Sequence, residues 1–127
     1  MSRIFNSLLA GVVLAAFPAA GHHSFAAEYD SSAPITVKGT VTKVEWTNPH
    51  SYVYVDVRDV NGNVVNWAVE GYPPNTLRRT GFTRDLMKQG DMVTINGWKA
   101  RDGANRMAAR DVTFANGNKM YFGPTAQ

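Results

Sequence analysis

The stretch SYVYVDVRDVNGNVVNWAVE, residues 51–70, decides the fold, because apolar and polar side chains alternate on both sides of a glycine turn. Alternation with a period of two is typical of half-buried β-strands. It predicts strands over residues 51–58 and 63–70. In the first strand the inward side chains are Val53, Val55 and Val57, and the outward ones are Tyr52, Tyr54 and Asp56.

The turn between these strands sets their register. A two-residue turn at Asn61-Gly62 would place Val57 opposite a polar face of the second strand. A three-residue loop over residues 60–62, with Gly62 in the left-handed conformation, keeps apolar residues opposite one another. The sequence therefore predicts the longer loop, which pairs Val57 with Val65, Val55 with Trp67 and Tyr52 with Glu70, and leaves His50 near Tyr72.

Further strands and a helical segment surround the hairpin. The apolar series changes parity after Val41 and again after Ala109, which predicts two β-bulges. Asn75 and Thr83 are predicted N-caps of two helical turns that end at glycines. The expected elements are strands over residues 35–47, 91–98, 105–114 and 119–122, and helical turns over 76–80 and 84–89.

This order of elements predicts a mainly β domain. The expected fold is a small five- to six-stranded OB-like Greek-key barrel with one short helical segment between strands 3 and 4. A β-sandwich would need about seven strands and no helix at that point. The chain divides into a signal peptide over residues 1–21, an N-terminal arm over 22–34 and a single β-barrel domain over 35–127. Trp67 and Trp98 are expected to pack in or beside the core.

The N-terminus has the features of a secretory leader. Arg3 provides a positive charge, and an uncharged apolar stretch, residues 8–20, follows it. That stretch is too short to span a bilayer, so a removable signal peptide is expected rather than an anchor. Ala19 and Gly21 suit the −3 and −1 positions of a cleavage site. Cleavage after Gly21 would start a periplasmic or secreted protein, without a membrane span, at His22.

Composition narrows the function further. Removing residues 1–21 from the 127-residue chain leaves 106 residues, and only Arg3 of the 13 basic residues is lost, leaving 12 against 10 acidic ones. This mild and scattered charge argues against nucleic-acid binding. The chain has no cysteine, which excludes disulfides and thiolate metal sites. It also lacks a nucleophile elbow, a His-Glu-x-x-His motif and a phosphate-binding glycine loop, so no enzyme is predicted unless a bound copper ion does redox chemistry.

The three histidines suggest a metal site. His22 and His23 would lie at the new N-terminus, and an α-amine with neutral imidazoles is a good ligand set for copper(II). His50 follows Pro49 in a loop at the expected rim of the barrel. If the arm folds back to this rim, the three imidazoles and the amine could share one copper ion. The alternative is that His22-His23 is a solvated leader and His50 a surface residue.

Carboxylates and aromatic residues complete the set of candidates. Glu28, Asp30, Glu45 and Glu70 could orient the imidazole rings as hydrogen-bond acceptors. A second hypothesis needs no metal: an OB-like interaction module would bind a periplasmic protein, peptide or glycan by stacking on its outer face. Cross-strand packing is the competing explanation for the aromatic rings. The residues assigned to this face are Trp46, Tyr52, Tyr54 and Glu70.

Three short motifs resemble one known family. They are His22-His23-Ser24-Phe25-Ala26, Asn48-Pro49-His50-Ser51 and the stretch from Leu77 to Arg84. The chain is similar over essentially its whole mature length to small exported bacterial proteins known only as domain of unknown function 6152. This resemblance implies export and a single β-barrel domain, and it implies no activity.

Overall fold

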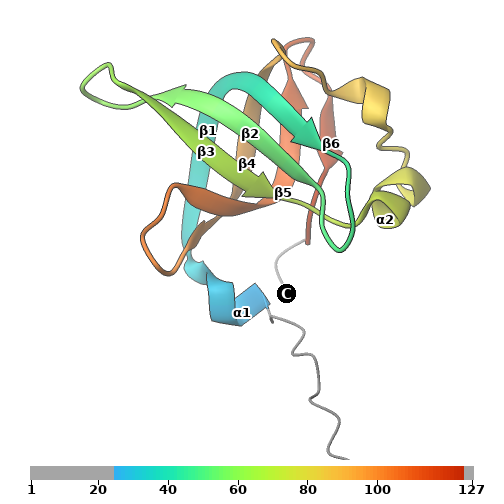
Figure 1. Cartoon of the computed structure of the whole chain (residues 1–127), viewed down its shortest axis with the longest axis horizontal. Helices are drawn as coiled ribbons and strands as arrows, with labels where there is room; N and C mark the ends of the chain where they lie inside the picture. The colour runs from blue at the N-terminus through green and yellow to red at the C-terminus, as the bar shows by residue number, and fades with distance from the viewer. Residues whose placement is uncertain (1–24, 125–127) are drawn as a thin grey trace, which may run out of the picture.

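The chain folds into one mainly β domain, and the structure, a computed structural model, describes residues 25–124 (Figure 1). Six strands form a single sheet in the order β3-β2-β1-β4-β5-β6, and its neighbours in that order are antiparallel. No helix within residues 25–124 is both long and apolar enough to cross a membrane. The elements are α1 (Phe25–Glu28), β1 (Tyr29–Glu45), β2 (Tyr52–Arg58), β3 (Val64–Glu70), α2 (Pro74–Arg79), the 3-10 turn η1 (Arg84–Leu86), β4 (Met92–Ala100), β5 (Arg106–Phe114) and β6 (Lys119–Tyr121).

The β2–β3 hairpin has the predicted register. Gly62 has a φ of 83°, and its N–H donates to the carbonyl of Asp59 at 3.0 Å, as the three-residue loop requires. The pairs Val57–Val65, Val55–Trp67 and Tyr52–Glu70 all form. The hydrophobic pattern was sufficient here because a slip of one residue would turn every valine of β2 toward solvent.

Both predicted bulges are present. The pairing of β1 with β2 shifts between Val41 and Lys43, and the pairing of β4 with β5 shifts at Gly97, which leaves Arg110 as the extra residue. Gly97 lies against β5 so closely that a Cβ atom would be 1.9 Å from the Ala108 carbonyl oxygen. The second bulge therefore needs glycine opposite it.

β1 starts earlier than predicted. The alternation indicated a strand from Ile35 and an arm before it, but the strand begins at Tyr29, which pairs with Ala100 of β4. The prediction failed because residues 30–34 have no apolar alternation, and the pairs of Tyr29 and Pro34 with β4 are separated by an irregularity in the register. Part of the expected arm is thus a strand of the sheet.

The helical segment between β3 and β4 also differs in detail. α2 begins at Pro74, two residues before the predicted start, because proline is well suited to the first turn of a helix. Asn75 is therefore inside the helix rather than its N-cap, and its side chain accepts a hydrogen bond from Arg78. Thr83 does precede η1, but without a capping side-chain bond, and η1 ends at Leu86 instead of Gln89.

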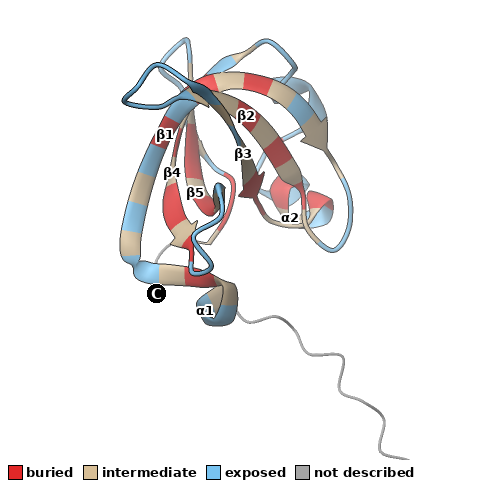
Figure 2. Cartoon of the chain, turned by 60° about the vertical axis from the view of Figure 1, so that its left-hand side comes forward, coloured by how far each residue is buried: buried red, intermediate tan, exposed pale blue. Residues whose placement is uncertain are grey.

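Apolar side chains form two separate clusters. The main core lies inside the curved sheet and includes Leu77 of α2. Buried residues alternate with exposed or half-buried ones along the middle of β1 and in β2 (Figure 2). Val53 and Val55 are both 0% exposed, and Trp67 packs against this core. The small cluster consists of Tyr29, Trp98, Ala100 and Ala108, with Phe25 packed against them.

Candidate functional site

A cavity of about 250 Å³ opens beside the small cluster and contains one of the predicted histidines. Segments far apart in the sequence meet there: α1, the start of β1, the β1–β2 loop, the end of β3 and the residues after β6. Its walls are Phe25, Glu28, Tyr29, His50, Glu70, Gly71, Tyr72, Ala108 and Pro124.

Backbone hydrogen bonds place His50 at this cavity. The N–H of Ser51 donates to the carbonyl of Tyr72 at 3.2 Å, and the N–H of Gly71 donates to the carbonyl of Ser51 at 2.8 Å. The hydroxyl of Thr47 donates to the carbonyl of His50 at 3.3 Å. The loop is therefore tied to the chain that leaves β3, and His50 and Tyr72 share a wall of the cavity, as the predicted register implied.

Glu70 is the centre of the polar side chains in this cavity. Its carboxylate Oε1 lies 3.4 Å from Nδ1 of His50, and its side chain is only 11% exposed. The other oxygen, Oε2, accepts a hydrogen bond from the hydroxyl of Tyr29, which is buried. One carboxylate thus joins the rim histidine to a buried tyrosine.

Burial and this carboxylate change the acidity of two tyrosines. Burial, followed by the hydrogen bond to Glu70, raises the pKa of Tyr29 far above its ordinary value, although the guanidinium of Arg106 opposes the rise. That guanidinium lies 5.6 Å from the centre of the Tyr29 ring. Burial and the charge of Glu70 raise the pKa of Tyr52 to about 12. Both phenols therefore keep their protons to a higher pH than an ordinary tyrosine does.

The helix α1 is attached firmly next to the cavity. The ring of Phe25 lies edge-on to Trp98, with centroids 5.3 Å apart, and 5.6 Å from the ring of Tyr29. Arg101 bonds two carbonyls of α1: its Nε donates to Ala26 at 2.8 Å and its backbone N–H to Glu28 at 2.9 Å. These contacts hold the first described residue of the chain at the wall of the cavity.

The structure brings together only part of the predicted metal site. His22, His23, the signal peptide and its cleavage site lie outside the described residues. Within residues 25–124, no group of three or more His, Asp or Glu side chains is arranged to hold a metal ion. Of the four candidate carboxylates, Glu70 contacts His50 and Glu28 lies in the same cavity wall. Asp30 instead accepts hydrogen bonds from Ser32.

The predicted aromatic face is only partly assembled. The rings of Tyr52 and Tyr54 stack on each other with centroids 6.4 Å apart. Glu45 accepts a hydrogen bond from the Tyr54 hydroxyl at 3.4 Å and pairs with Lys43 at 2.6 Å. Trp46 does not join them, because it packs against the main core with its ring 6.2 Å from that of Phe82.

Sequence reasoning missed Phe25 and Tyr29. Both were part of the expected arm, and neither lies in an apolar alternating run. The available signal was two aromatic residues four positions apart, a spacing that brings side chains together on a helix, although Tyr29 is the first residue of β1 and follows the end of α1. The structure was needed to show that Tyr29 is buried and that its hydroxyl donates a hydrogen bond to Glu70.

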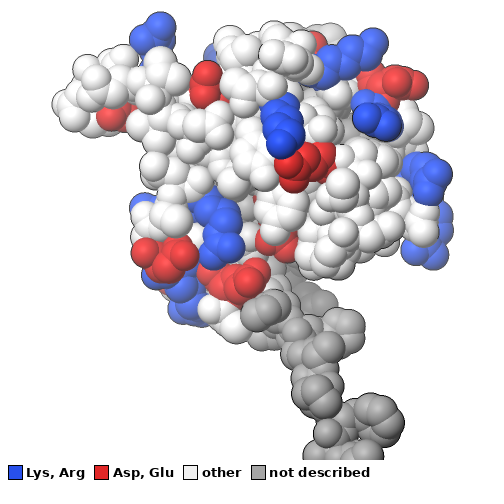
Figure 3. All heavy atoms as spheres, in the orientation of Figure 1, with Lys and Arg blue, Asp and Glu red and all other residues white. Residues whose placement is uncertain are grey.

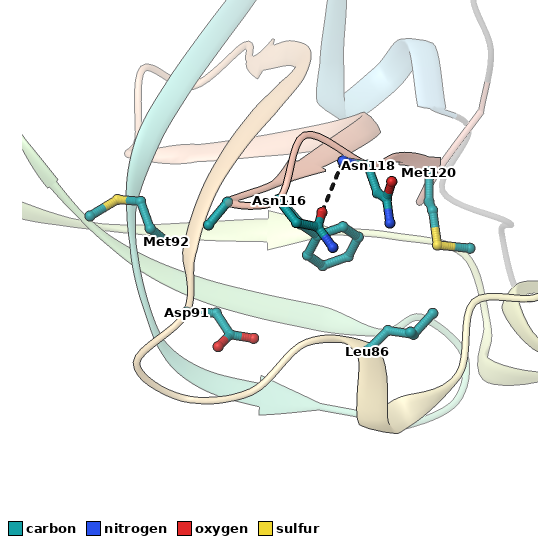
Figure 4. A pocket seen from close by; sticks show the side chains of 8 residues that line it. Leu86, Asp91, Met92, Asn116, Asn118 and Met120 are labelled. Carbon is teal, nitrogen blue, oxygen red and sulfur yellow. Dashed lines mark hydrogen bonds between the residues drawn. The ribbon is translucent and has the colours of Figure 1, made fainter.

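A second cavity, of about 310 Å³, is much less suited to metal chemistry (Figure 4). Leu86, Met92 and Met120 lie around it, and its wall has no imidazole and one carboxylate, that of Asp91. Asp91 already accepts a hydrogen bond from the N–H of Lys88 at 2.8 Å. Elsewhere, the face in Figure 3 shows acidic and basic side chains scattered rather than gathered by sign.

Fold and site together define a small, mainly β protein with a histidine–carboxylate–tyrosine cavity at the N-terminal end of its described chain. The profile of the family of unknown function DUF6152 matches residues 10–109 of the 127, so the chain belongs to that family. None of the curated proteins matches the sequence.

Proposed function

We propose that the protein is exported to the periplasm and binds copper(II) through His22, His23 and His50. The observation that carries this proposal is the position of Phe25 and His50 in the walls of one cavity. Phe25 follows directly after His22-His23-Ser24 in the sequence. The predicted N-terminal ligands are therefore covalently tied to the cavity that contains the third histidine.

Chain geometry supports a shared site. His22 precedes Phe25 by three residues, and consecutive Cα atoms are about 3.8 Å apart, so the two Cα atoms are at most about 11 Å apart. An imidazole and the α-amine at that point are within reach of the cavity mouth. Among the divalent metals, copper(II) binds imidazole and amine nitrogens especially tightly, and it prefers them in a square-planar arrangement.

We also propose that the sheet is an OB-like Greek-key barrel and that a signal peptide is removed from the chain. The parallel pairing of Ala68–Glu70 with Arg106–Ala108 joins β3 to β5, which is a reason to regard strands β1 to β5 as an OB-like Greek-key barrel. The apolar leader and the small residues before His22 are the reasons to expect a signal peptide. Cleavage after Gly21 would supply the terminal amine.

The test is a copper(II) titration of the exported protein, with intact mass measured before and after. The expected mass is that of residues 22–127, with one copper ion bound. His50→Ala should weaken binding at least tenfold, which is about 1.4 kcal/mol. Asn48→Ala, in the same exposed loop, is the matched control and should bind as the native protein does. Extra residues before His22 should also weaken binding and change the copper spectrum.

Equal affinity in the extended protein, in His50→Ala and in the native protein would refute the shared site. The alternative, a metal-free module that binds a protein, peptide or glycan through Tyr52 and Tyr54, would then be favoured. Its supporting observation is that the two stacked tyrosines lie half-buried on the outer face of β2. Tyr54→Ala would be the next variant, with partner capture as the readout.

A further inference from the structure

We propose that Glu70 is the positioning residue of the histidine site: it holds the proton of His50 on Nδ1 and leaves Nε2 as the atom that takes the metal. The copper part of this inference depends on the proposed function. The assignment of the proton does not, because it concerns only described residues of the metal-free protein.

The first step is electrostatic. Nδ1 of His50 lies 3.4 Å from Oε1 of Glu70. If that nitrogen carried a lone pair, it would face the electron-rich oxygen of a carboxylate whose side chain is only 11% exposed. If it carries the proton, the positive end of the N–H dipole lies beside the negatively charged carboxylate, and this attraction favours the Nδ1–H tautomer. A neutral His50 then has its lone pair on Nε2.

The second step is that Glu70 itself has little freedom to turn away. Its second oxygen accepts the hydrogen bond of Tyr29, and its backbone belongs to β3, paired with Tyr52 on one side and Ala108 on the other. Its side chain is only 11% exposed. The carboxylate is therefore held from two directions, and the orientation of the imidazole follows from it.

The third step is access. The side chain of His50 is 45% exposed although its Nδ1 faces the shielded carboxylate. The rest of the ring thus remains open to the cavity and to solvent. Ligating histidines commonly donate their other ring N–H to a carboxylate, which fixes the tautomer and makes the metal-binding nitrogen more basic. Of the four carboxylates that the sequence suggested for this role, the geometry selects Glu70.

The test reads the tautomer directly, by two-bond proton–nitrogen correlation spectra of the metal-free protein with ¹⁵N-labelled histidine. The His50 signals are those lost in His50→Ala. The expected native result is the Nδ1–H tautomer. Glu70→Gln should shift the population toward Nε2–H, because an amide can donate to Nδ1 as well as accept from it. Tyr29→Phe keeps the carboxylate and should retain the Nδ1–H form.

Glu45→Gln is the matched control, because its carboxylate contacts Lys43 and Tyr54 instead of a histidine. It should leave the His50 tautomer unchanged. An Nε2–H tautomer in the native protein, or identical His50 spectra in Glu70→Gln and the native protein, would overturn the inference. A merely structural role of Glu70 would change the stability of the protein but not the position of this proton.

Copper binding then separates the two proposals. Where the native protein binds copper, Glu70→Gln should weaken it by at least tenfold, in the range typical of residues that orient a metal ligand. An unchanged affinity would refute the positioning role in metal binding. If the native protein shows the Nδ1–H tautomer but binds no copper, the proposed function fails while the assignment of Glu70 to His50 stands.

Discussion

The main core and the small cluster are built in different ways. The main core draws valines, Ile95, Met107 and aromatic rings from the sheet and the α2 region, and all of its members are apolar. The small cluster is a patch of a few residues, and one of them, Tyr29, has a hydroxyl bonded to a carboxylate. The difference indicates a division of roles: the main core provides most of the stability, and the small cluster positions α1 at the candidate site.

Val55→Asp should break the main core completely. The side chain is 0% exposed, and an unpaired charge buried there would cost several kcal/mol, comparable with the whole stability of about 5–15 kcal/mol of a small domain. Circular dichroism should show an unfolded chain. Tyr54→Ser, next to it on the outward side of β2, is the control and should remain folded. A folded Val55→Asp protein would contradict the assignment of the core.

Ile95→Ala should destabilise the fold without affecting the site. Truncating a fully buried aliphatic side chain typically costs about 2–5 kcal/mol, and Ile95 is 0% exposed. Urea unfolding should show this loss. At temperatures where the variant is folded, its copper affinity should equal that of the native protein. Loss of affinity in the folded variant would show that the two clusters are not independent.

Phe25→Ala should have the opposite effect: a small loss of stability and a clear loss of copper affinity. Phe25 is only partly buried, so we expect a loss of stability of about 1 kcal/mol, below the range for fully buried aromatic residues. Amide exchange in residues 26–28 should accelerate, and copper affinity should fall about tenfold because α1 no longer holds the N-terminus at the cavity. Tyr121→Ala removes an exposed aromatic ring of β6 and serves as the control. Unchanged exchange in α1 would refute the role of the small cluster.

Alkaline pH should also destabilise the folded protein. Burial raises the pKa values of Tyr29 and Tyr52, the latter to about 12, above the value of about 10 in an unfolded chain. The folded state therefore holds these protons more tightly. Its stability is complete below about pH 10 and falls as the pH rises through the folded pKa values. Urea midpoints should decrease above that pH, and less so in Tyr29→Phe. Tyrosinate absorbance showing that all five tyrosines ionise near pH 10 in the folded protein would contradict this.

Much of the sheet was predictable because strand alternation is a local property. The register of β2 and β3, both bulges and the left-handed conformation of Gly62 follow from which side chains must face inward. The start of β1 and the start of α2 were predicted wrongly. Residues 30–34 lack apolar alternation, yet Tyr29 and Pro34 pair with β4 on either side of an irregular stretch. Pro74 begins the helix because its fixed φ suits the first turn.

The candidate site was predictable only in part. His50 and Glu70 could be placed on neighbouring segments by the hairpin register, which sets Tyr52 against Glu70. Tyr29 could not be assigned to the same cavity, since its approach depends on β1 pairing with β4 and on β3 pairing with β5. These pairings join residues far apart in the sequence, and no local pattern encodes them.

The sequence by itself determined the mainly β class, the hairpin, the bulges and the choice of three histidines as candidate ligands. Those features depend on side-chain alternation, on glycine at a left-handed turn and on the chemistry of imidazole. The tertiary structure alone decided which carboxylate faces His50, that Tyr29 bonds its other oxygen, and that α1 ends at the same cavity. A contact between distant segments is settled by how the whole sheet curves and closes, which no short stretch of the chain can specify.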